Sequence, residues 1–305
     1  MQTRYLDIEN INNLIKTNPK AFVDKVEDDY NKQLEKVAEK ILSKETPIKI
    51  ILIGGPSCSG KTTSANLLGG ILKKHGKKVL SIGMDNFFIS RDDRPRLPNG
   101  SVDYDSINIV DLELMQKCFM ELFETGKSKF PLYDFIGGKS LPNKTLVKAD
   151  SDTVIIFEGI HTLNPKLIAK LGTRDVYKIF ICNGDGYTMG DVKIEPRQFR
   201  MVRRMVRDVQ FRGVSMANTL KHWKDVTDAE DLYIIPHAKG VNSSINTSHA
   251  YEINLFKPDI DSALENSDLT LEQIPWFKVF GEIDSLDKHI LPKTTLMKEF
   301  INFEK

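Results

Sequence analysis

Short runs rich in β-branched and other apolar residues alternate with helix-like segments along the chain. The runs that predict strands lie at 48–53, 79–84, 154–157 and 177–182. The segments that predict helices lie at 62–74, 111–123 and 196–212. The run at 154–157 is apolar at every position, which is typical of a strand buried on both faces. Strands that alternate with helices predict an α/β fold, a parallel sheet with helices on both faces.

The first 46 residues predict a helical extension. Asn18 and Pro19 have the pattern of a helix start, with Asn18 as the N-cap and Pro19 in the first turn. From Val23 to Ile41, apolar residues recur at alternating steps of three and four and form one stripe. Such a stripe can bind a partner protein, but packing against the following domain is the interpretation we favour.

The composition narrows the class of protein. The 305 residues are 40% hydrophobic and 28% charged, as in ordinary globular proteins. With 43 basic and 42 acidic residues, the net charge of +1 argues against a dedicated nucleic-acid binder. We find neither a secretory signal nor a run of the ~18 apolar residues that a membrane span needs. Three scattered cysteines predict no disulfide framework. We therefore expect a cytoplasmic protein with reduced thiols and without membrane or nucleic-acid partners.

A phosphate-binding loop is the strongest motif. The segment 55–62 matches the pattern G-x-x-x-x-G-K-[ST] at every fixed position, between a predicted strand and a predicted helix. Its glycines let the backbone curl so that amide N–H groups point inward, at the positive end of the helix dipole. Lys61 can reach the β- and γ-phosphates, and the Thr62 hydroxyl can bind Mg²⁺. The expected nucleotide-binding residues are Gly55, Pro56, Ser57, Cys58, Ser59, Gly60, Lys61, Thr62 and Thr63.

Cys58 occupies a position that the motif leaves open. The plain interpretation is that any small residue fits there. The alternative is a thiolate stabilised by the amides that hold phosphate.

Acidic residues follow the predicted strands. Asp85 lies at the carboxyl end of the second strand, the edge at which open α/β sheets bind ligands. It can accept a proton from a hydroxyl group or hold Mg²⁺ through water, although a role in a turn is the simpler alternative. Glu158 ends the strand that begins at Val154 and can complete the surroundings of the metal. Asp103 and Asp105 follow a turn signal at 98–100.

The helix predicted at 196–212 carries many arginines. Arg200, Arg204 and Arg207 are spaced so that they share one face. An RNA-binding helix, a solvated face with glutamate partners and a phosphate-directed lid are the three interpretations. The near-zero net charge weakens the first, and the lack of acidic residues between Arg197 and Arg207 weakens the second. We favour the lid, because guanidinium groups stabilise a phosphoryl group during transfer.

The order of these segments resembles the uridine kinase and phosphoribulokinase family of P-loop kinases, from about residue 50 to about residue 256. The matching segments are GGPSCSGKTT, MDNFF, GSVDYD, FPLYDF, VIIFEGI and RRMVRDVQFRG. The segments TLKHWKDV and LPKTTLMKEFI further resemble a bacterial branch that is often fused to an N-terminal TGS domain. Here a helical extension stands in its place.

The resemblance implies a P-loop NTPase fold, with ATP and Mg²⁺ as cofactors, and allows a homo-oligomer. It also implies three parts: a helical extension at 1–46, a kinase domain with its arginine lid at 47–260, and a C-terminal tail at 261–305 that packs on the kinase domain. The expected reaction is transfer of the γ-phosphate of ATP to the 5′-hydroxyl of a nucleoside.

The same resemblance implies roles for single residues on the acceptor side. Asp85 takes the proton of the 5′-hydroxyl, and Asp105 holds the ribose hydroxyls. Tyr133 and Phe135 line the nucleoside pocket, and Arg204 lies beside the ribose. Lid arginines that approach the phosphates are Arg207 and Arg212.

Three positions that read the base in uridine kinases depart from that pattern; they are Gly138, Val214 and His222. A site without these polar groups should discriminate bases poorly or differently. The sequence therefore leaves two other functions open. One is a kinase of another small hydroxyl substrate, such as a sugar phosphate or a vitamin precursor. The other is a non-catalytic nucleotide sensor or RNA-associated protein.

Overall fold

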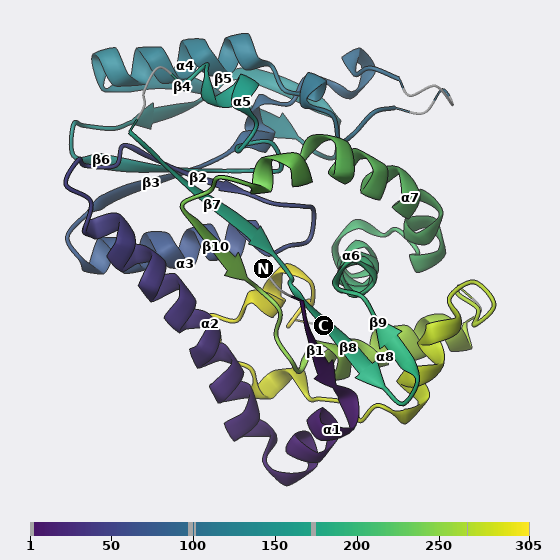
Figure 1. The fold of residues 1–305 in the computed structure, drawn as a ribbon. Coiled ribbons are helices and arrows are strands. Elements are labelled where there is room, and N and C mark those ends of the chain that lie inside the picture. The colour runs from purple at the N-terminus through teal and green to yellow at the C-terminus, as the bar shows by residue number, and fades with distance from the viewer. Residues whose placement is uncertain (1–2, 97–99, 101, 172–174, 267, 305) are drawn as a thin grey trace.

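Five parallel strands form the central sheet, in the order β10-β7-β2-β6-β3 (Figure 1). The computed structural model describes residues 3–96, 100, 102–171, 175–266 and 268–304. The strands of this sheet are β2 (Ile50–Gly54), β3 (Lys78–Gly83), β6 (Thr153–Glu158), β7 (Val176–Cys182) and β10 (Ser243–Asn246). All pairings within it are parallel, so the predicted α/β class is confirmed. Most of the turn expected at 98–100 lies outside the described residues.

Helices cover both faces of the sheet. The helices are α1 (Ile8–Thr17), α2 (Pro19–Leu42), α3 (Lys61–Lys74), α4 (Leu112–Thr125), α5 (Pro165–Ile168), α6 (Pro196–Arg212), α7 (Met216–Tyr233) and α8 (Glu252–Glu265). Successive residues of the central strand β2 face opposite sides. Ile51 and Ile53 join the hydrophobic core under α2 and α3, whereas Ile50 and Leu52 join the core under α4.

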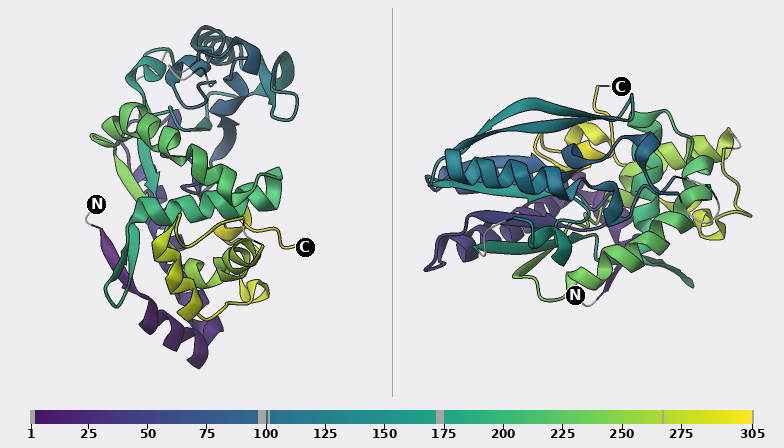
Figure 2. Two further views of the ribbon diagram at one scale, coloured as in Figure 1. Left: turned by 90° about the vertical axis from the view of Figure 1, so that its right-hand side faces the viewer. Right: turned by 90° about the horizontal axis from the view of Figure 1, so that it is seen from above.

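A hairpin and a small second sheet complete the strands. The hairpin is β4 (Lys127–Asp134) with β5 (Lys139–Lys148), and the small sheet consists of β1 (Arg4–Asp7), β8 (Asp185–Met189) and β9 (Val192–Ile194). Figure 2 shows α4 and the hairpin at one end of the molecule, the yellow C-terminal segment toward the other, and α6 and α7 between them.

The long helix of the N-terminal extension, α2, begins as predicted at Asn18. Its side chain accepts a hydrogen bond from the Ala21 amide (3.1 Å), and Pro19 opens α2. The apolar stripe of α2 packs with α3 in one core, so its buried side chains serve the fold. Strand β1, which pairs in parallel with β8, is an addition that the sequence did not predict. The predicted domain limits at 46 and 260 stay predictions.

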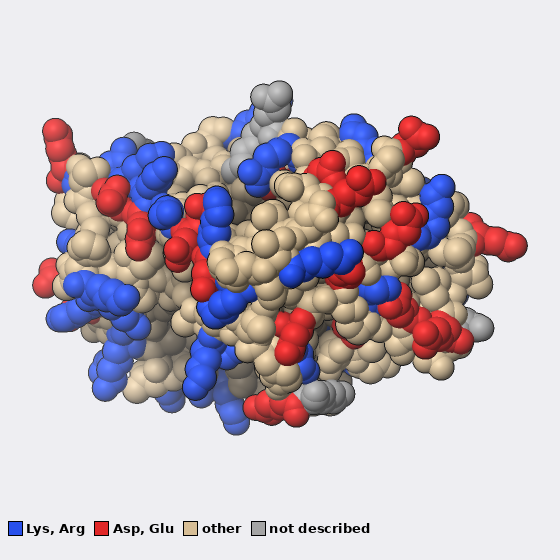
Figure 3. Space-filling model, turned by 90° about the horizontal axis from the view of Figure 1, so that it is seen from below, with Lys and Arg blue, Asp and Glu red and all other residues tan. Residues whose placement is uncertain are grey.

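The surface of the described chain carries charges of both signs. On the face seen from below in Figure 3, basic side chains gather toward the left and acidic ones toward the right, with both signs interspersed. Among the described residues, no helix is both long enough and apolar enough to cross a membrane.

Candidate active site

The phosphate-binding loop joins the central strand β2 to α3. Gly55 has a φ of +156°, and a Cβ there would lie 2.0 Å from the carbonyl oxygen of Ile181 on the neighbouring strand. Gly60 has a φ of +83°, in the left-handed region that favours glycine. The two fixed glycines of the motif are therefore required, one by close approach of backbone and one by conformation.

Cys58 also has a left-handed backbone, with a φ of 59°. A residue with a side chain adopts this conformation only at a cost, unless the surroundings enforce it. The thiol is buried. The position is therefore constrained by its backbone conformation and by burial, which the motif pattern did not indicate.

Three successive carbonyl groups of the loop are bound from outside. Because these oxygens point away from the phosphate site, the amide N–H groups between them can turn toward it. The contacts are Arg200 Nη1 to Ser57 O (2.9 Å), Arg203 Nη1 to Cys58 O (3.3 Å) and Thr247 Oγ1 to Ser59 O (2.7 Å).

Arg200 and Arg203 therefore support the loop. Arg200 pairs with Glu230 of α7, and Arg203 pairs with Glu252 of α8. No acidic residue stands between Arg197 and Arg207 in the sequence, and the carboxylates that pair with Arg200 and Arg203 come instead from α7 and α8. The assignment of Arg200 to a lid face does not hold, because its side chain is buried beneath the loop.

Lys61 and Thr62 occupy the first turn of α3. The Lys61 side chain is buried, and its Nζ donates to the carbonyl oxygen of Pro56 (2.7 Å). Burial lowers the pKa of Lys61, although the carboxylates of Glu158, Glu299 and Asp85 act in the opposite direction. These carboxylates place Lys61 among several negative charges at the edge of the sheet.

The two residues expected at Mg²⁺ lie together. Thr62 Oγ1 donates to Glu158 Oε1 at 3.1 Å, and burial raises the pKa of Glu158 to about 7. Hydroxyl and carboxylate oxygens are ligands that Mg²⁺ accepts, and this ion usually keeps several waters and phosphate oxygens as well. Among the described residues, no group of three His, Cys, Asp or Glu side chains could hold a metal by itself. The pair therefore fits an ion that arrives with a nucleotide.

Asp85 lies at the same edge, in the short turn Met84–Phe87 that follows β3. The register pairs Gly83 of β3 with Glu158 of β6, so Asp85 is two residues beyond the neighbour of Glu158. Burial raises the pKa of Asp85, while the cations Lys61, Arg212 and Arg94 oppose the shift. A partly buried carboxylate in the field of the loop lysine can accept a proton from a hydroxyl group.

A cavity of about 590 Å³ lies between α6, α7 and the loop 102–105, and Arg212, which lines it, is one of the cations that act on Asp85. This volume is in the range of small-molecule sites. Asp105 and Arg204 line it, and burial raises the pKa of Asp105 against the opposing charge of Arg204. Asp103 shapes the loop by accepting from the amides of Asp105 (3.0 Å) and Ser106 (2.9 Å).

Asp208 gathers the predicted lid arginines, and sequence analysis missed it. Its Oδ1 accepts from Arg207 Nη2 at 2.7 Å. Arg212 Nη1 lies 3.6 Å from Oδ1, and Arg204 Nε lies 3.6 Å from Oδ2. Arg204, Asp208 and Arg212 all line the cavity. The single carboxylate thus holds three guanidinium groups between the cavity and the phosphate loop.

Comparison with known proteins agrees with this geometry. The sequence profile described as the phosphoribulokinase/uridine kinase family matches residues 50–253. The chain belongs to this family.

Curated proteins with similar sequences are named uridine kinases. A uridine kinase of Ureaplasma parvum is 29% identical over 205 residues, which cover 67% of this chain and 90% of that protein. A uridine kinase of Mycoplasma genitalium is 31% identical over 178 residues, which cover 58% and 74%. A solved structure of a possible uridine kinase from Bacillus stearothermophilus is 22% identical, with a TM-score of 0.41 over 49% of this chain and 79% of that chain.

Membership of this kinase family supports a phosphotransferase activity, with ATP as the phosphate donor and typically Mg²⁺ as its companion. The phosphate loop, Asp85 and Glu158 stand at one sheet edge, as this activity needs.

The two aromatic residues that the family resemblance assigned to the acceptor lie outside the cavity lining. Tyr133 is buried, and its ring contacts Phe88 and Phe135. Phe135 is 59% exposed at the end of β4. The structure thus brings Asp105 and Arg204 to the cavity but leaves both aromatic rings beside it.

Arg94 fills the space among the aromatic rings, and sequence analysis missed it too. Its guanidinium carbon lies 5.1 Å from the ring centres of Phe88 and Tyr133 and 5.4 Å from that of Tyr104. The residue is only 8% exposed. Within the described part of the chain it makes one long hydrogen bond, from Nε to Ile89 O (3.4 Å), and no ion pair. A buried cation so poorly paired is uncommon outside ligand sites.

The three positions that depart from uridine kinases divide into two groups. Val214 and His222 line the cavity. Gly138 lies away from it, and a Cβ there would come within 2.9 Å of the Arg91 guanidinium. Two of the three positions thus line the cavity, from α7 and its preceding loop, whereas the third does not.

Proposed function

We propose that this chain is a nucleoside kinase that transfers the γ-phosphate of ATP to a nucleoside 5′-hydroxyl. The observation that carries the proposal is the position of Asp105, which lines the cavity together with Arg212, a cation that acts on Asp85 at the sheet edge. A carboxylate there can accept two charge-assisted hydrogen bonds from a vicinal diol.

In the proposed reaction, the loop amides and Lys61 hold the phosphates of ATP. Mg²⁺, held by Thr62 and Glu158, would neutralise phosphate charge. Asp85 accepts the proton of the attacking hydroxyl, because its carboxylate stands at the sheet edge beside the loop lysine. Arg207 turns from Asp208 toward the transferred phosphoryl group, whose charge its guanidinium stabilises.

Mass spectrometry of products after incubation with ATP, Mg²⁺ and a mixed nucleoside pool tests the proposal. Nucleoside monophosphates are the expected products. A matched pool of 2′-deoxynucleosides should react at less than about a tenth of the rate, because Asp105 then loses one hydroxyl partner. Equal rates on both pools would remove the main structural support for the nucleoside assignment.

Arg94 favours a second candidate acceptor, a hydroxyl compound that carries a carboxylate or phosphate. Its guanidinium acts on the same two carboxylates, Asp85 and Asp105, that are proposed to hold the acceptor. Adding sugar phosphates and hydroxy acids to the product assay compares the two candidates directly. Phosphorylation of these anionic compounds alone would replace the nucleoside proposal.

A further inference from the structure

The C-terminal segment of the chain reaches the phosphate loop. The short turn Leu296–Glu299 packs against the start of α3. Leu296 is fully buried on Gly60, where an added Cβ would lie 2.6 Å from its Cδ1. The contact therefore falls on the glycine whose left-handed conformation ends the loop.

Glu299 places a carboxylate on the first turn of α3. Its Oε2 accepts from Thr63 Oγ1 at 3.0 Å and from the Thr63 amide at 3.4 Å. The first amides of a helix have no partner within the helix, and in a phosphate loop they face the nucleotide phosphates. A negatively charged oxygen of the protein thus occupies a donor pair that a phosphate oxygen would use.

The charge of Glu299 acts on the same groups as a bound phosphate would. It is one of the three carboxylates that raise the pKa of Lys61 against the effect of burial. It also raises the pKa of Glu158, after burial and Asp85. ATP would therefore meet a carboxylate of like charge inside its own site, and like charges in a partly buried site repel.

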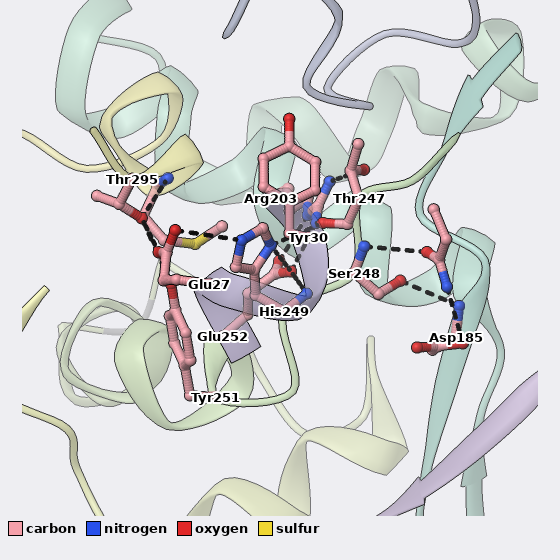
Figure 4. Close-up of polar contacts among 12 residues, drawn as sticks. Glu27, Tyr30, Asp185, Arg203, Thr247, Ser248, His249, Tyr251, Glu252 and Thr295 are labelled. Carbon is pink, nitrogen blue, oxygen red and sulfur yellow. Dashed lines mark hydrogen bonds and ion pairs between the residues drawn. The ribbon is translucent and has the colours of Figure 1, made fainter. Parts of the chain in front are cut away.

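The residues on either side of Glu299 are anchored. Thr295 Oγ1 donates to Glu27 of α2, as does the hydroxyl of Tyr251 (Figure 4). Phe300 lies under the guanidinium of Arg203, 5.0 Å from ring centre to Cζ. The segment is thus held between α2 and the arginine that binds the carbonyl of Cys58.

We propose that Glu299 takes the place of a nucleotide phosphate in the free protein and is displaced when ATP or ADP binds. The C-terminal segment then forms a wall of the nucleotide site, lowers nucleotide affinity and loosens when the site fills. The proposal rests on nucleotide binding to the loop and is independent of the acceptor.

Calorimetric titration with ADP and Mg²⁺ tests it on the full chain. Glu299→Gln keeps the size of the side chain and removes its charge, so we expect about tenfold tighter binding, the change for one charged hydrogen bond. Glu304→Gln is the control, because it makes the same charge change on an exposed residue near the same end. Its affinity should equal that of the native protein.

The direction of the change in ADP affinity shows whether Glu299 competes with a nucleotide phosphate or supports nucleotide binding. Equal or weaker binding by Glu299→Gln, with phosphoryl transfer intact in the native protein, would overturn this inference alone. Failure of the native protein to bind ADP would overturn both this inference and the proposed function.

Hydrogen exchange of the native protein provides a test that needs no variant. Peptides covering residues 292–301 should exchange faster when ADP is bound, because the carboxylate that fixes them has left Thr63. Unchanged or slower exchange in these peptides would contradict the displacement.

Discussion

Replacing Arg203 with methionine should destabilise the protein severely. The guanidinium is fully buried, and Glu252 accepts from its Nε (2.5 Å) and Nη2 (2.6 Å). The remaining donors reach Thr247 O (2.6 Å), Thr247 Oγ1 (3.2 Å) and Cys58 O (3.3 Å). Methionine fills a similar volume but leaves the carboxylate of Glu252 charged and buried without its cation.

The magnitude follows from that lone charge. Removing one partner of a buried ion pair costs about 3–5 kcal/mol, more than the pair itself contributes. Domains are stable by about 5–15 kcal/mol, so the free energy of unfolding should fall by about a fifth or more. Because Cys58 O loses its donor as well, ADP affinity should fall in the molecules that remain folded.

Urea denaturation of the native protein and of two variants measures this cost. The control is Arg197→Met on the same helix, whose guanidinium also makes two bonds to one carboxylate, Asp231, but is 40% exposed. It also lies 3.6 Å from Glu230, but that buried carboxylate keeps Arg200 as its partner in the variant. An exposed pair contributes at most about 1 kcal/mol. Equal losses in Arg203→Met and Arg197→Met would refute the argument that burial sets the cost.

A double variant checks the mechanism of the loss. Arg203→Met combined with Glu252→Gln removes the uncompensated charge, so it should be more stable than Arg203→Met alone. A double variant that is less stable than the single one would mean that lost packing, and not the buried charge, dominates.

Three further predictions concern the chemistry. Lys61→Ala should abolish transfer mainly through kcat, because the charge that follows the migrating phosphate is gone; unchanged kcat in a folded variant would exclude that role. Asp85→Asn should bind ATP near normally while transfer falls roughly 10²–10⁴-fold. Burial raises the pKa of Asp85 above 3.8, so kcat/KM of the native enzyme should fall as the pH drops through that raised value, and the same limb in Asp85→Asn would assign it to another group. Asp105→Ala should erase most of the preference for ribonucleosides, measured as kcat/KM on matched pairs, without changing ATP affinity.

The sequence predicted the phosphate loop and four strands of the central sheet, all but β10, because these features are encoded locally. Apolar runs such as 154–157 mark strands buried on both faces, and the loop motif follows one of them directly. Asp85 and Glu158 could be placed for the same reason, since one lies just beyond the carboxyl end of β3 and the other ends β6. Parallel strands bring their carboxyl ends to one edge without further information.

The partners of the arginines could not be predicted in this way. Arg203 and Glu252 are 49 residues apart, and Arg200 and Glu230 are 30 apart. Their contact depends on how α6 packs against α7 and α8. The spacing of residues within α6 gives no information on that packing. Periodicity therefore grouped Arg200 with Arg204 and Arg207, whereas burial separates them.

The contact of the C-terminal segment with the phosphate loop could not be predicted, for a different reason. The short turns of this segment, including Leu296–Glu299, have no helical or strand period that a pattern could detect. The burial of their apolar residues is explained by contacts with Gly60 and Arg203, which lie far earlier in the chain. The contact of Glu299 with Thr63 is a product of the tertiary fold.

The phosphate loop thus receives two kinds of contact, and their effects on nucleotide affinity have opposite signs. Arg203 binds a carbonyl on the outside of the loop, so it stabilises the shape that both the free and the bound states need. Glu299 binds donors on the inside, so it stabilises only the free state. A group that binds one state alone shifts the equilibrium by the free energy of that contact. Loss of Arg203 should therefore weaken both folding and ADP binding, whereas loss of the Glu299 charge should strengthen ADP binding at unchanged or slightly lower stability. If both variants weakened ADP binding, the inside and outside of the loop would not be energetically distinct, and the competition between Glu299 and phosphate would be excluded.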